Sequence, residues 1–481
     1  MKDTRENINQ DLTEVVAVSP PSSNWQAIKD AIAGTEADYT KIGLKRAIFL
    51  LAVPMILELV MESTFAVVDI FFVGKLGPSA VATVGLTETY LYLLYSLAMG
   101  VAMAVTAIIA RRVGEKKVED AGIAATQSIF LGVLCSIPFA IAGIFFAKDL
   151  LTLMGADAWG IEHGYRYTQW MLGGNVVIVL LFVINAIFRG AGDAAIAMRV
   201  LWIANAINIV LDPILIFGWG PIPAFGIEGA AIATTIGRGL GVLVQLWTIF
   251  HGGKHIQVKR SQFYWDAKII INIVRTSLGG VGQMLVGMTS WIFLMRILAS
   301  VSNEAVAGAT IALRVMLFTL MPAWGMSNAA ATLVGQNLGA GHPDRAESAV
   351  WKTGVYNMIF LSIVSVVYFA FNDTLVDIFT DDAQVIAIGA EWIRILSYSY
   401  LVYGWWMVSS AAFNGAGDTN TPTKINLVFF WLIQIPLSYY LAIVQDWAHS
   451  GVFWGVFISE TGVGLFTLWL FSRGGWKTMK V

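Results

Sequence analysis

Long apolar runs alternate with short polar segments along almost the whole chain. Runs such as 92–109, 128–147 and 171–187 are each about long enough to cross a ~30 Å hydrocarbon layer as a helix. They are too long for the ~10-residue alternating strips of a membrane barrel. The pattern predicts twelve spanning helices, at roughly 46–73, 86–109, 121–147, 164–187, 194–217, 228–250, 272–298, 310–333, 347–371, 385–411, 423–444 and 450–472.

The composition agrees with this pattern. Hydrophobic residues make up 57% of the chain and charged residues 13%, against about 25% charged residues in a soluble domain. The net charge is −2 without any basic run, so we expect no nucleic-acid partner. Residues 1–21 are polar, unlike a signal peptide. Cys135 is the single cysteine, which excludes an internal disulfide and a cysteine-based metal site. We therefore expect an all-α integral membrane protein.

Positive charges indicate how the chain crosses the membrane. The loops on one side hold Arg112, Lys259 and Lys424 among others, while the opposite loops hold little beyond Lys75 and Lys148. Lysine and arginine gather on the cytoplasmic side of spanning helices. We expect a multi-pass protein of the inner (plasma) membrane with both termini in the cytoplasm, and an even number of spans agrees with this.

The chain repeats itself at a constant offset of 225 residues. FRGAGD at 188–193 returns as FNGAGD at 413–418, and SAVA at 79–82 returns as EAVA at 304–307. Each half has six spans, so both halves enter the membrane from the same side and form a parallel repeat. We expect two six-helix lobes that face each other across a central cavity, the architecture of a transporter. The glycines of the repeated motif favour a tight reversal between helices.

Five regions follow from these observations. Residues 24–33 have the pattern of a short amphipathic helix that stops at Gly34, in a tail lying at the membrane surface. The expected regions are a cytoplasmic tail 1–44, an N-terminal lobe 45–252, a cytoplasmic linker 253–270, a C-terminal lobe 271–474 and a cytoplasmic end 475–481.

The first span carries three acids on one helix face. Glu58, Glu62 and Asp69 follow each other at steps of four and seven residues. An ionisable residue inside a span costs several kcal/mol unless it is paired, so each is a functional candidate. Pro54 leaves the carbonyl of Leu50 without its usual donor, which favours a bend and makes this proline a candidate hinge.

The fifth span has a matching polar face. Asn205, Asn208 and Asp212 lie on one side of it, followed by the second candidate hinge, Pro213. Asn185 lies late in the fourth span.

We expect Asp69 and Asp212 to face each other inside one lobe. Burial beside a like charge would let these acids exchange protons with the bath. Alternatively, Asp69, Asn185, Asn208 and Asp212 would form an oxygen nest for Na⁺, although no firm metal site is predicted. The structural alternative is that these groups only bond helices together. For Glu58 and Glu62, coupling to the ion and lining a wet cavity are equally open.

The second half lacks this cluster. Adding 225 converts Asp69 to Leu294, Asp212 to Leu437 and Glu58 to Gln283. A site needed only once would lie in one half, here the first. We expect Glu58, Gln283 and Gln434 to line the substrate cavity, and Glu391 to pair with Arg394. The polar residues of the second half's spans are Gln283, Arg296, Arg314, Glu391, Arg394, Gln434 and Glu460.

Several stretches resemble one transporter family. AVPMILELVMESTFAVVDIFFVGKLG (52–77), NIVLDPILIFG (208–218) and LVGQNLGAG (333–341) are similar to motifs of the multidrug and toxic compound extrusion (MATE) family, within the MOP flippase superfamily. The resemblance covers about 45–475. It implies proton- or sodium-coupled export of large hydrophobic cations.

Within that family, this chain resembles the DinF-like branch, which is thought to couple ions in its first lobe. The NorM-like branch relies on an acid in the seventh span and another in the tenth, where this chain has Gln283 and no mid-span Asp. The positions that match the DinF-like motif are Asp69, Tyr167, Asn185, Asn208, Asp212 and Thr234, to which we add Glu62 as a candidate from the first span.

We therefore expect an antiporter that exports hydrophobic, cationic drugs or toxins by alternating access in exchange for protons, or for Na⁺. It would work as a monomer without a cofactor, with amphipathic small molecules and membrane lipids as partners. A flippase for a lipid-linked or anionic precursor is the alternative, which Arg275, Arg296 and Arg314 keep open. A membrane enzyme is disfavoured because no nucleophile, base and acid set appears.

Overall fold

The computed structural model describes residues 24–35, 37–251, 256 and 258–479. Within these residues the chain is helical, without a strand. Its spans are α3 (Leu44–Gly74), α4 (Pro78–Gly114), α5 (Val118–Leu153), η1 to α7 (Gly160–Gly164, Tyr165–Gly173, Val176–Ala191), α8 (Ala194–Phe217), α9 (Ile227–His251), α10 (Ala267–Val301), α11 (Asn303–Gly339), α12 (Pro343–Asp377), α13 (Ala383–Ala416), α14 to η4 (Asn420–Asn426, Leu427–Gln434, Ile435–Tyr439, Tyr440–Val444) and α16 (Ala448–Ser472).

The twelve predicted spans are confirmed as helices long and apolar enough to cross a membrane. Most of them extend beyond the predicted bounds. Helix α11, for example, begins at Asn303 rather than near 310, because Ser302 caps it by accepting a hydrogen bond from the amide of Ala305 at 3.0 Å. The apolar pattern marks only the part of a helix that lies in hydrocarbon, so it misses such polar ends.

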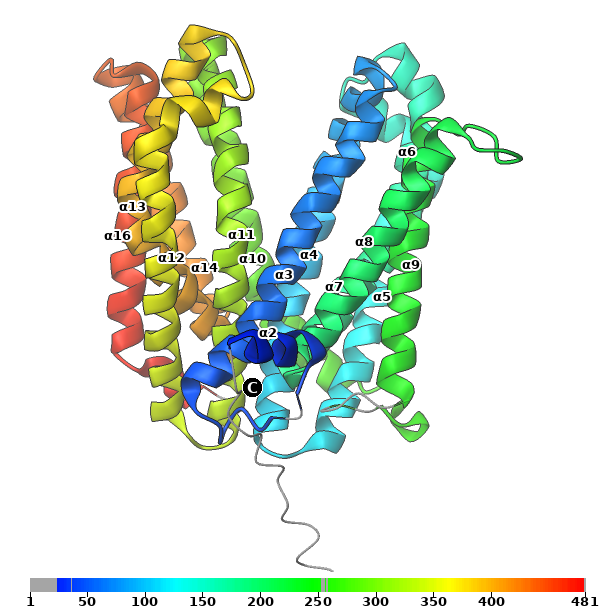
Figure 1. Cartoon of the computed structure of the whole chain (residues 1–481), viewed down its shortest axis with the longest axis vertical. Helices are drawn as coiled ribbons and strands as arrows, with labels where there is room; N and C mark the ends of the chain where they lie inside the picture. The colour runs from blue at the N-terminus through cyan, green and yellow to red at the C-terminus, as the bar shows by residue number, and fades with distance from the viewer. Residues whose placement is uncertain (1–23, 36, 252–255, 257, 480–481) are drawn as a thin grey trace, which may run out of the picture.

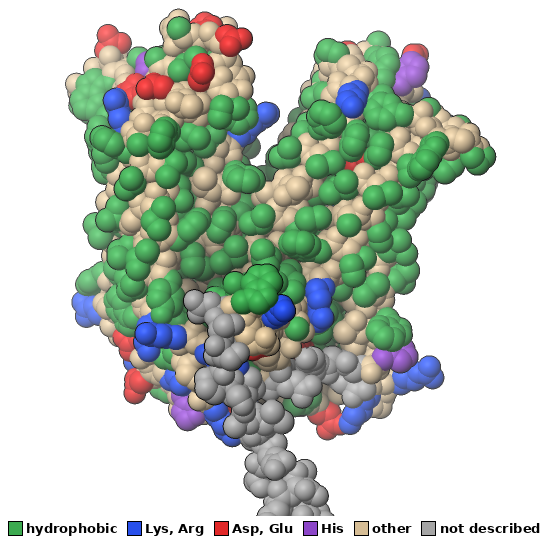
Figure 2. Space-filling view, viewed as in Figure 1, with side chains coloured by type: hydrophobic (Ala, Val, Ile, Leu, Met, Phe, Trp, Pro, Cys, Tyr) green, Lys and Arg blue, Asp and Glu red, His purple; other side chains and the backbone are tan. Residues whose placement is uncertain are grey.

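The helices form two lobes (Figure 1). Helices α3 to α9 form the N-lobe, and α10 to α16 form the C-lobe. The lobes meet at the end where α2 and the C-terminus lie, here named the lower end, and they splay apart at the opposite, upper end. Figure 2 shows the surface hollowed between the lobes at the upper end, and we name this hollow the cleft.

The backbone repeats its irregularities at the predicted offset. The interiors of α5 and α12 each contain one non-helical residue, Phe146 (φ −124°) and Phe371 (φ −128°), which are 225 positions apart. Gly192 (φ 97°) and Gly417 (φ 91°) end α7 and α13 in the left-handed conformation, which favours glycine. The two repeated motifs are therefore tight reversals, as expected.

The lower halves of the lobes contact each other at two equivalent glycines, Gly114 and Gly339, and we name this contact the glycine seam. A Cβ added to Gly114 of α4 would lie 2.0 Å from the carbonyl oxygen of Gln336, and one added to Gly339 of α11 would lie 2.2 Å from that of Arg111. These two contacts are related by the same offset of 225. Because no side chain fits there, the helices of the two lobes approach each other at backbone distance.

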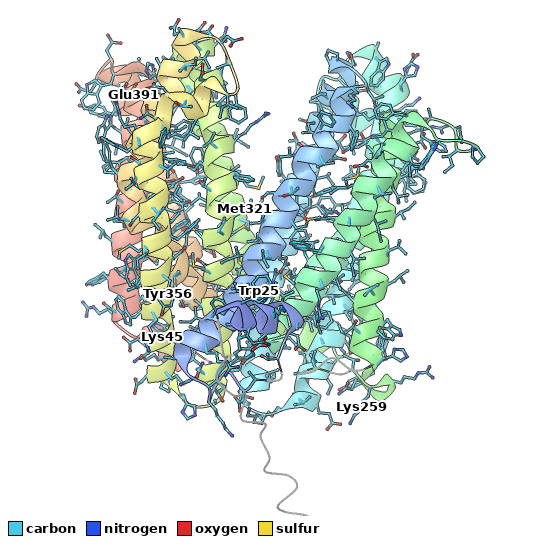
Figure 3. All side chains as sticks on the ribbon, viewed as in Figure 1. Trp25, Lys45, Lys259, Met321, Tyr356 and Glu391 are labelled. Carbon is cyan, nitrogen blue, oxygen red and sulfur yellow. The ribbon has the colours of Figure 1, made fainter. Side chains whose placement is uncertain are left out.

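The segment before α3 bridges both lobes at the lower end. The predicted short helix is present as α2 (Asn24–Ala33), which lies across this end (Figure 1) and carries Trp25 (Figure 3). After it, the hydroxyl of Tyr39 donates to the carbonyl of Gly192 in the N-lobe at 3.2 Å, and Arg345 of the C-lobe donates to the carbonyl of Tyr39 at 3.3 Å. We name residues 37–43 the linker segment.

The expected five-region division stays a prediction. Residues 1–23 and 36 of the expected tail, residue 252 of the expected N-terminal lobe, residues 253–255 and 257 of the expected linker between the lobes (253–270), and residues 480 and 481 lie outside the described residues.

Candidate functional site

The N-lobe brings together the two aspartates that the sequence singled out. Asp212 of α8 is fully buried, and neither of its carboxylate oxygens has a hydrogen-bond partner. Asp69 of α3 is partly buried and lies close enough for its charge to act on Asp212. Tyr167 of α6 is buried and lies close enough for the charges of Asp69 and Asp212 to act on its phenol. Neither carboxylate forms an ion pair within the described residues, although the charge of Arg238 in α9 acts on Asp69.

A second polar contact lies one helical turn away from Asp212. The side-chain amide of Asn208 donates to the hydroxyl of Thr234 in α9 at 3.0 Å. The carbonyl oxygen of the Asn208 side chain is buried and has no donor. Asn208 Oδ1 and the two carboxylate oxygens of Asp212 are thus three buried acceptors without a donor. Such a set of oxygens can bind a proton or a small cation.

Glu62 has partners that the sequence reasoning missed. Its carboxylate accepts hydrogen bonds from Arg238 of α9 at 2.9 Å and from Asn205 of α8 at 3.2 Å. Arg238 is 5% exposed and lies 5.5 Å from the ring centre of Phe65. The only signal for this pairing was an arginine inside the sixth span. Arg238 forms an ion pair with Glu62 at 2.9 Å, and its charge also acts on Asp69, whereas Asp212 has no such partner.

Glu58 belongs to a third cluster, nearer the lower end. One of its oxygens accepts from both Asn185 and Arg189 of α7, each at 3.1 Å. The carbonyl oxygen of the Asn185 side chain accepts in turn from Gln245 of α9 at 2.6 Å. The side-chain oxygen of Asn185 therefore already accepts a hydrogen bond. Asn185 belongs to the cluster around Glu58 and not to the aspartates with which it was expected to form a Na⁺ site. Within the described residues, no group of three or more His, Cys, Asp or Glu side chains could hold a metal ion.

The C-lobe repeats this contact without its charge. Gln283 of α10 donates to the hydroxyl of Ser410 in α13 at 3.3 Å, at positions 225 beyond Glu58 and Asn185. Glu58, Gln283 and Gln434 are 3%, 7% and 1% exposed. They are therefore buried inside their lobes and do not line the open cleft in this conformation, contrary to expectation, because the helix faces that carry them pack inside each lobe.

The cleft holds a different pair of charges. Glu88 of α4 and Arg314 of α11 are both exposed, and they are close enough for the charge of Arg314 to act on Glu88. They come from opposite lobes and differ by 226 positions, so they occupy nearly equivalent places. Figure 3 shows Met321, two turns further along α11, beside the space between the lobes. Glu88 was not predicted to lie in the cleft, since the apolar pattern does not indicate which face of a helix meets the cleft.

Two further expectations changed. The carboxylate of Glu391, which Figure 3 shows at the upper end, accepts from the hydroxyl of Ser450 at 2.7 Å and lies 3.1 Å from the ring of His449. It forms no close ion pair with Arg394 within the described residues, because α16 offers closer partners. Helices α3 and α8 also continue unbroken through Pro54 and Pro213, so neither candidate hinge interrupts its helix in this conformation.

Comparison with known proteins agrees with this geometry. The MatE family model matches the chain twice, at residues 54–214 and 280–440, once in each lobe. A probable multidrug resistance protein NorM from Thermotoga maritima is 25% identical over 91% of this chain and 94% of its own length. The FAD transporter of Shewanella oneidensis is 26% identical over 82% of this chain and 87% of its own length.

Solved structures share the fold. A crystal structure of MATE in complex with MaL6 superposes with a TM-score of 0.85, at 24% identity, over 92% of this chain and 99% of that chain. An outward-facing multidrug resistance MATE family transporter of the MOP superfamily gives the same TM-score over 93% of this chain and 99% of that chain. Since the two matches of the family model cover more than half of the sequence, the chain belongs to the MATE family, whose members are membrane transporters and not enzymes.

Proposed function

We propose that this protein exports amphipathic, cationic drugs or toxins in exchange for protons by alternating access. The observation that carries the proposal is the Asp69 and Asp212 pair, in which buried Asp212 has no hydrogen-bond partner and Asp69 is the acid whose charge acts on it. Relatives named as multidrug resistance proteins support drug export as the activity. The protein acts as a monomer surrounded by membrane lipids and needs no cofactor.

The lower end faces the cytoplasm in this proposal. The lower loop between α4 and α5 carries Lys116 and Lys117, and the loop before α10 carries Lys259, which Figure 3 shows at this end. The upper loops hold little beyond Lys75. Because positive charges gather on the cytoplasmic side of spanning helices, the cleft opens to the outer side of the plasma membrane in this proposal. The conformation is accordingly outward-open, with the glycine seam closed toward the cytoplasm.

Asp69 and Asp212 are the coupling groups. In the outward-open state, a proton that reaches them from outside removes the repulsion between the two carboxylates. Neutral side chains lower the cost of burial, so the protonated N-lobe favours a different packing of α3 against α8. Pro54 and Pro213 are the points where these helices would bend. Coupling requires only that the pair binds the proton more tightly in one conformation than in the other.

The ion is a proton rather than Na⁺ in this proposal, following the DinF-like expectation. An oxygen cage for Na⁺ would need several ligands, whereas Asn185 is engaged by Glu58 and Gln245. Asn208 and Thr234 bond to each other beside the aspartates and hold α8 against α9. Tyr167 closes the site on the side of α6.

A second candidate function is transport of an anionic amphipathic precursor. Arg314 is exposed and faces Glu88 across the cleft, so the cleft is not uniformly acidic. One relative is named an FAD transporter, and FAD carries phosphates. A flippase or an exporter of such a molecule would use Arg314 as its anchor.

The test uses purified protein in liposomes with a cationic dye, under either a pH gradient or a Na⁺ gradient. The matched variants are Asp69→Asn and, at the equivalent C-lobe position, Leu294→Ala. We expect dye transport under the pH gradient alone, lost in Asp69→Asn and retained in Leu294→Ala. If only the Na⁺ gradient drives transport, the coupling ion is Na⁺ and not a proton. If the protein moves FAD but not the dye, the second candidate function is favoured.

A further inference from the structure

The linker segment leads into α3 and is anchored on the N-lobe. The hydroxyl of Tyr39 donates to the carbonyl of Gly192, in the turn between α7 and α8, at 3.2 Å. The ring of Tyr39 packs on the same turn, since a Cβ added to Gly192 would lie 2.7 Å from it. Lys116, in the turn between α4 and α5, donates to the carboxylate of Asp38 at 2.9 Å. The segment is therefore bound to two turns of the N-lobe in addition to the helix that it starts.

One side chain of the C-lobe binds the same segment. The guanidinium of Arg345, in the first turn of α12, donates to the carbonyls of Tyr39 and Ile42. The charge of Asp38 also acts on Arg345. Hydrogen bonds from a charged donor are about twice as strong as neutral ones, so Arg345 contributes a strong contact across the lobe boundary.

An apolar cluster that crosses the lobe boundary surrounds these polar contacts. Ala31 of α2 and Ala37 and Tyr39 of the linker segment are buried in it, together with Leu333 of α11 and Ala349 of α12. If the lobes separated at the lower end, part of this apolar surface would meet water. Burial of the cluster therefore adds to the free energy that keeps the lower end closed.

The segment that leads into the C-lobe makes a related contact. Tyr264 lies 225 positions after Tyr39, just ahead of α10, and its carbonyl accepts from the side chain of Gln127 in α5 at 2.6 Å. The carbonyls of both tyrosines thus accept a hydrogen bond from a side chain of the opposite lobe. The later segment is the covalent connection between the lobes, whereas the linker segment continues into one lobe only. Its contact with the other lobe, through Arg345, is free to break and form again.

We propose that the linker segment is a latch that holds the lower end closed in the outward-open state, with Arg345 as the contact that is released. The inference rests on the proposed alternating access and does not depend on which ion is coupled. When the lower end opens, the segment stays on Gly192 and Lys116 of the N-lobe, and Arg345 moves away with the C-lobe. The strength of the latch then sets how often the cytoplasmic side opens.

The first experiment measures how often the lower end opens. Thr332 of α11 is fully buried there and donates to the carbonyl of Arg189 across the lobe boundary at 3.1 Å. In a background that carries Cys135→Ser, a cysteine introduced by Thr332→Cys reacts with a maleimide only while the lobes are apart at this end. The rate of modification of the purified protein therefore follows the population of the opened form.

Two latch variants are compared with a matched control in that background. Arg345→Met removes the donor from the C-lobe, and Tyr39→Phe removes only the hydroxyl that anchors the segment. The control is Arg473→Met, the same change at a C-lobe arginine that lies over the ring of Trp469. We expect the rate to rise about tenfold in Arg345→Met and about threefold in Tyr39→Phe, and to stay unchanged in the control.

Thermal unfolding shows which variants fold, and if Arg345→Met does not, Tyr39→Phe decides. An unchanged rate in a folded latch variant would overturn the proposal, as would an equal rise in the control.

The second experiment tests whether the segment must leave the C-lobe during transport. Thr40 of the segment and His342, next to the start of α12, line one pocket. The changes Thr40→Cys and His342→Cys, joined by a short reducible thiol reagent, tie the segment to the C-lobe. The matched control ties it to its own lobe through Lys41→Cys and Lys116→Cys, since both lysines pair with Asp38.

We expect the first link to stop dye transport in liposomes until a reductant cleaves it, and the control link to leave transport intact. Transport that continues through the first link would overturn the latch. If the wild type moves no dye under either gradient, the proposed antiport fails, while the modification rate of Thr332→Cys still decides whether the segment holds the lower end closed.

Discussion

The two lobes share a scaffold and differ in charge. Glu58 and Asn185 in the N-lobe occupy the same places as Gln283 and Ser410 in the C-lobe, and both pairs are hydrogen-bonded. The N-lobe contact is strengthened by Arg189, whereas the C-lobe contact is neutral. Packing between helices therefore survives duplication, because both copies must bury the same helix faces. Charge is free to diverge, and its distribution shows where each lobe acts.

The largest effect is expected at Asp212. Changing Asp212→Asn keeps the shape of the side chain but removes a titratable group from the centre of the N-lobe. Proton-driven dye transport should fall at least tenfold, which corresponds to about 1.4 kcal/mol in the barrier. At the equivalent C-lobe position, Leu437→Ala should keep most of the activity. Equal losses at both positions would mean that the lobes do not differ in this respect.

The ion pair between buried Arg238 and partly exposed Glu62 should contribute to the stability of the N-lobe. In Arg238→Met, Glu62 is left without its cation, which should cost about 1.5–3 kcal/mol, seen as a lower midpoint of thermal unfolding. The double change with Glu62→Gln should recover most of this loss, since no unpaired charge then remains. Position 238 corresponds to Val463 in the C-lobe, where the neutral change Val463→Ala should act independently of Glu62.

The glycine seam should behave alike in both lobes. Gly114→Ala and Gly339→Ala each place a Cβ against a carbonyl oxygen of the other lobe, which costs about 1–3 kcal/mol in the closed seam. Each change should therefore reduce the outward-open population, measured as a shorter distance between spin labels at the upper ends of α4 and α11. The control Gly287→Ala meets no atom within 4 Å and should leave the distances unchanged. Opposite shifts from the two seam variants would show that the seam is not symmetric.

The repeated contact gives a smaller and more direct comparison. Asn185→Ala removes a hydrogen bond to the carboxylate of Glu58, which should cost about 1.5–3 kcal/mol of stability. Ser410→Ala removes a neutral hydrogen bond and should cost about 0.5–1.5 kcal/mol. Thermal unfolding of the two variants side by side measures the difference. A Ser410→Ala variant less stable than Asn185→Ala would reverse the comparison.

The smallest effect is expected at Asp38 in the linker segment. Burial alone would raise the pKa of Asp38, but hydrogen bonds from Thr40 and Lys116 hold it below its ordinary value of 3.8. A lowered pKa stabilises the folded state at pH above 3.8, and this contribution is lost as the pH falls through the depressed value. Because Lys116 is exposed, the contribution should stay under about 1 kcal/mol.

The measurement is thermal unfolding of the wild type and of Asp38→Asn at neutral and acidic pH. The two proteins should differ slightly at neutral pH and converge at acidic pH. A difference that grows toward acidic pH would contradict the assignment.

The sequence was sufficient to predict the spans, the repeat and the aspartate pair, and insufficient to predict their partners. Span positions follow from apolar length, and Asp69 and Asp212 stand out because acids are rare in apolar runs. Arg238 lies 176 residues from Glu62, and the pattern within a span does not say which neighbouring helix an arginine meets. For the same reason, the sequence does not show that Glu88 and Arg314 lie close enough for their charges to interact.

The most direct test of the central claim is proton release by the purified protein when substrate is added. A pH-sensitive dye in weakly buffered detergent solution records the protons that a cationic substrate displaces. The wild type should release protons on addition of substrate, and the Asp69→Asn, Asp212→Asn double variant should release clearly fewer while still folding. Undiminished release from the double variant would show that these two acids are not the coupling groups.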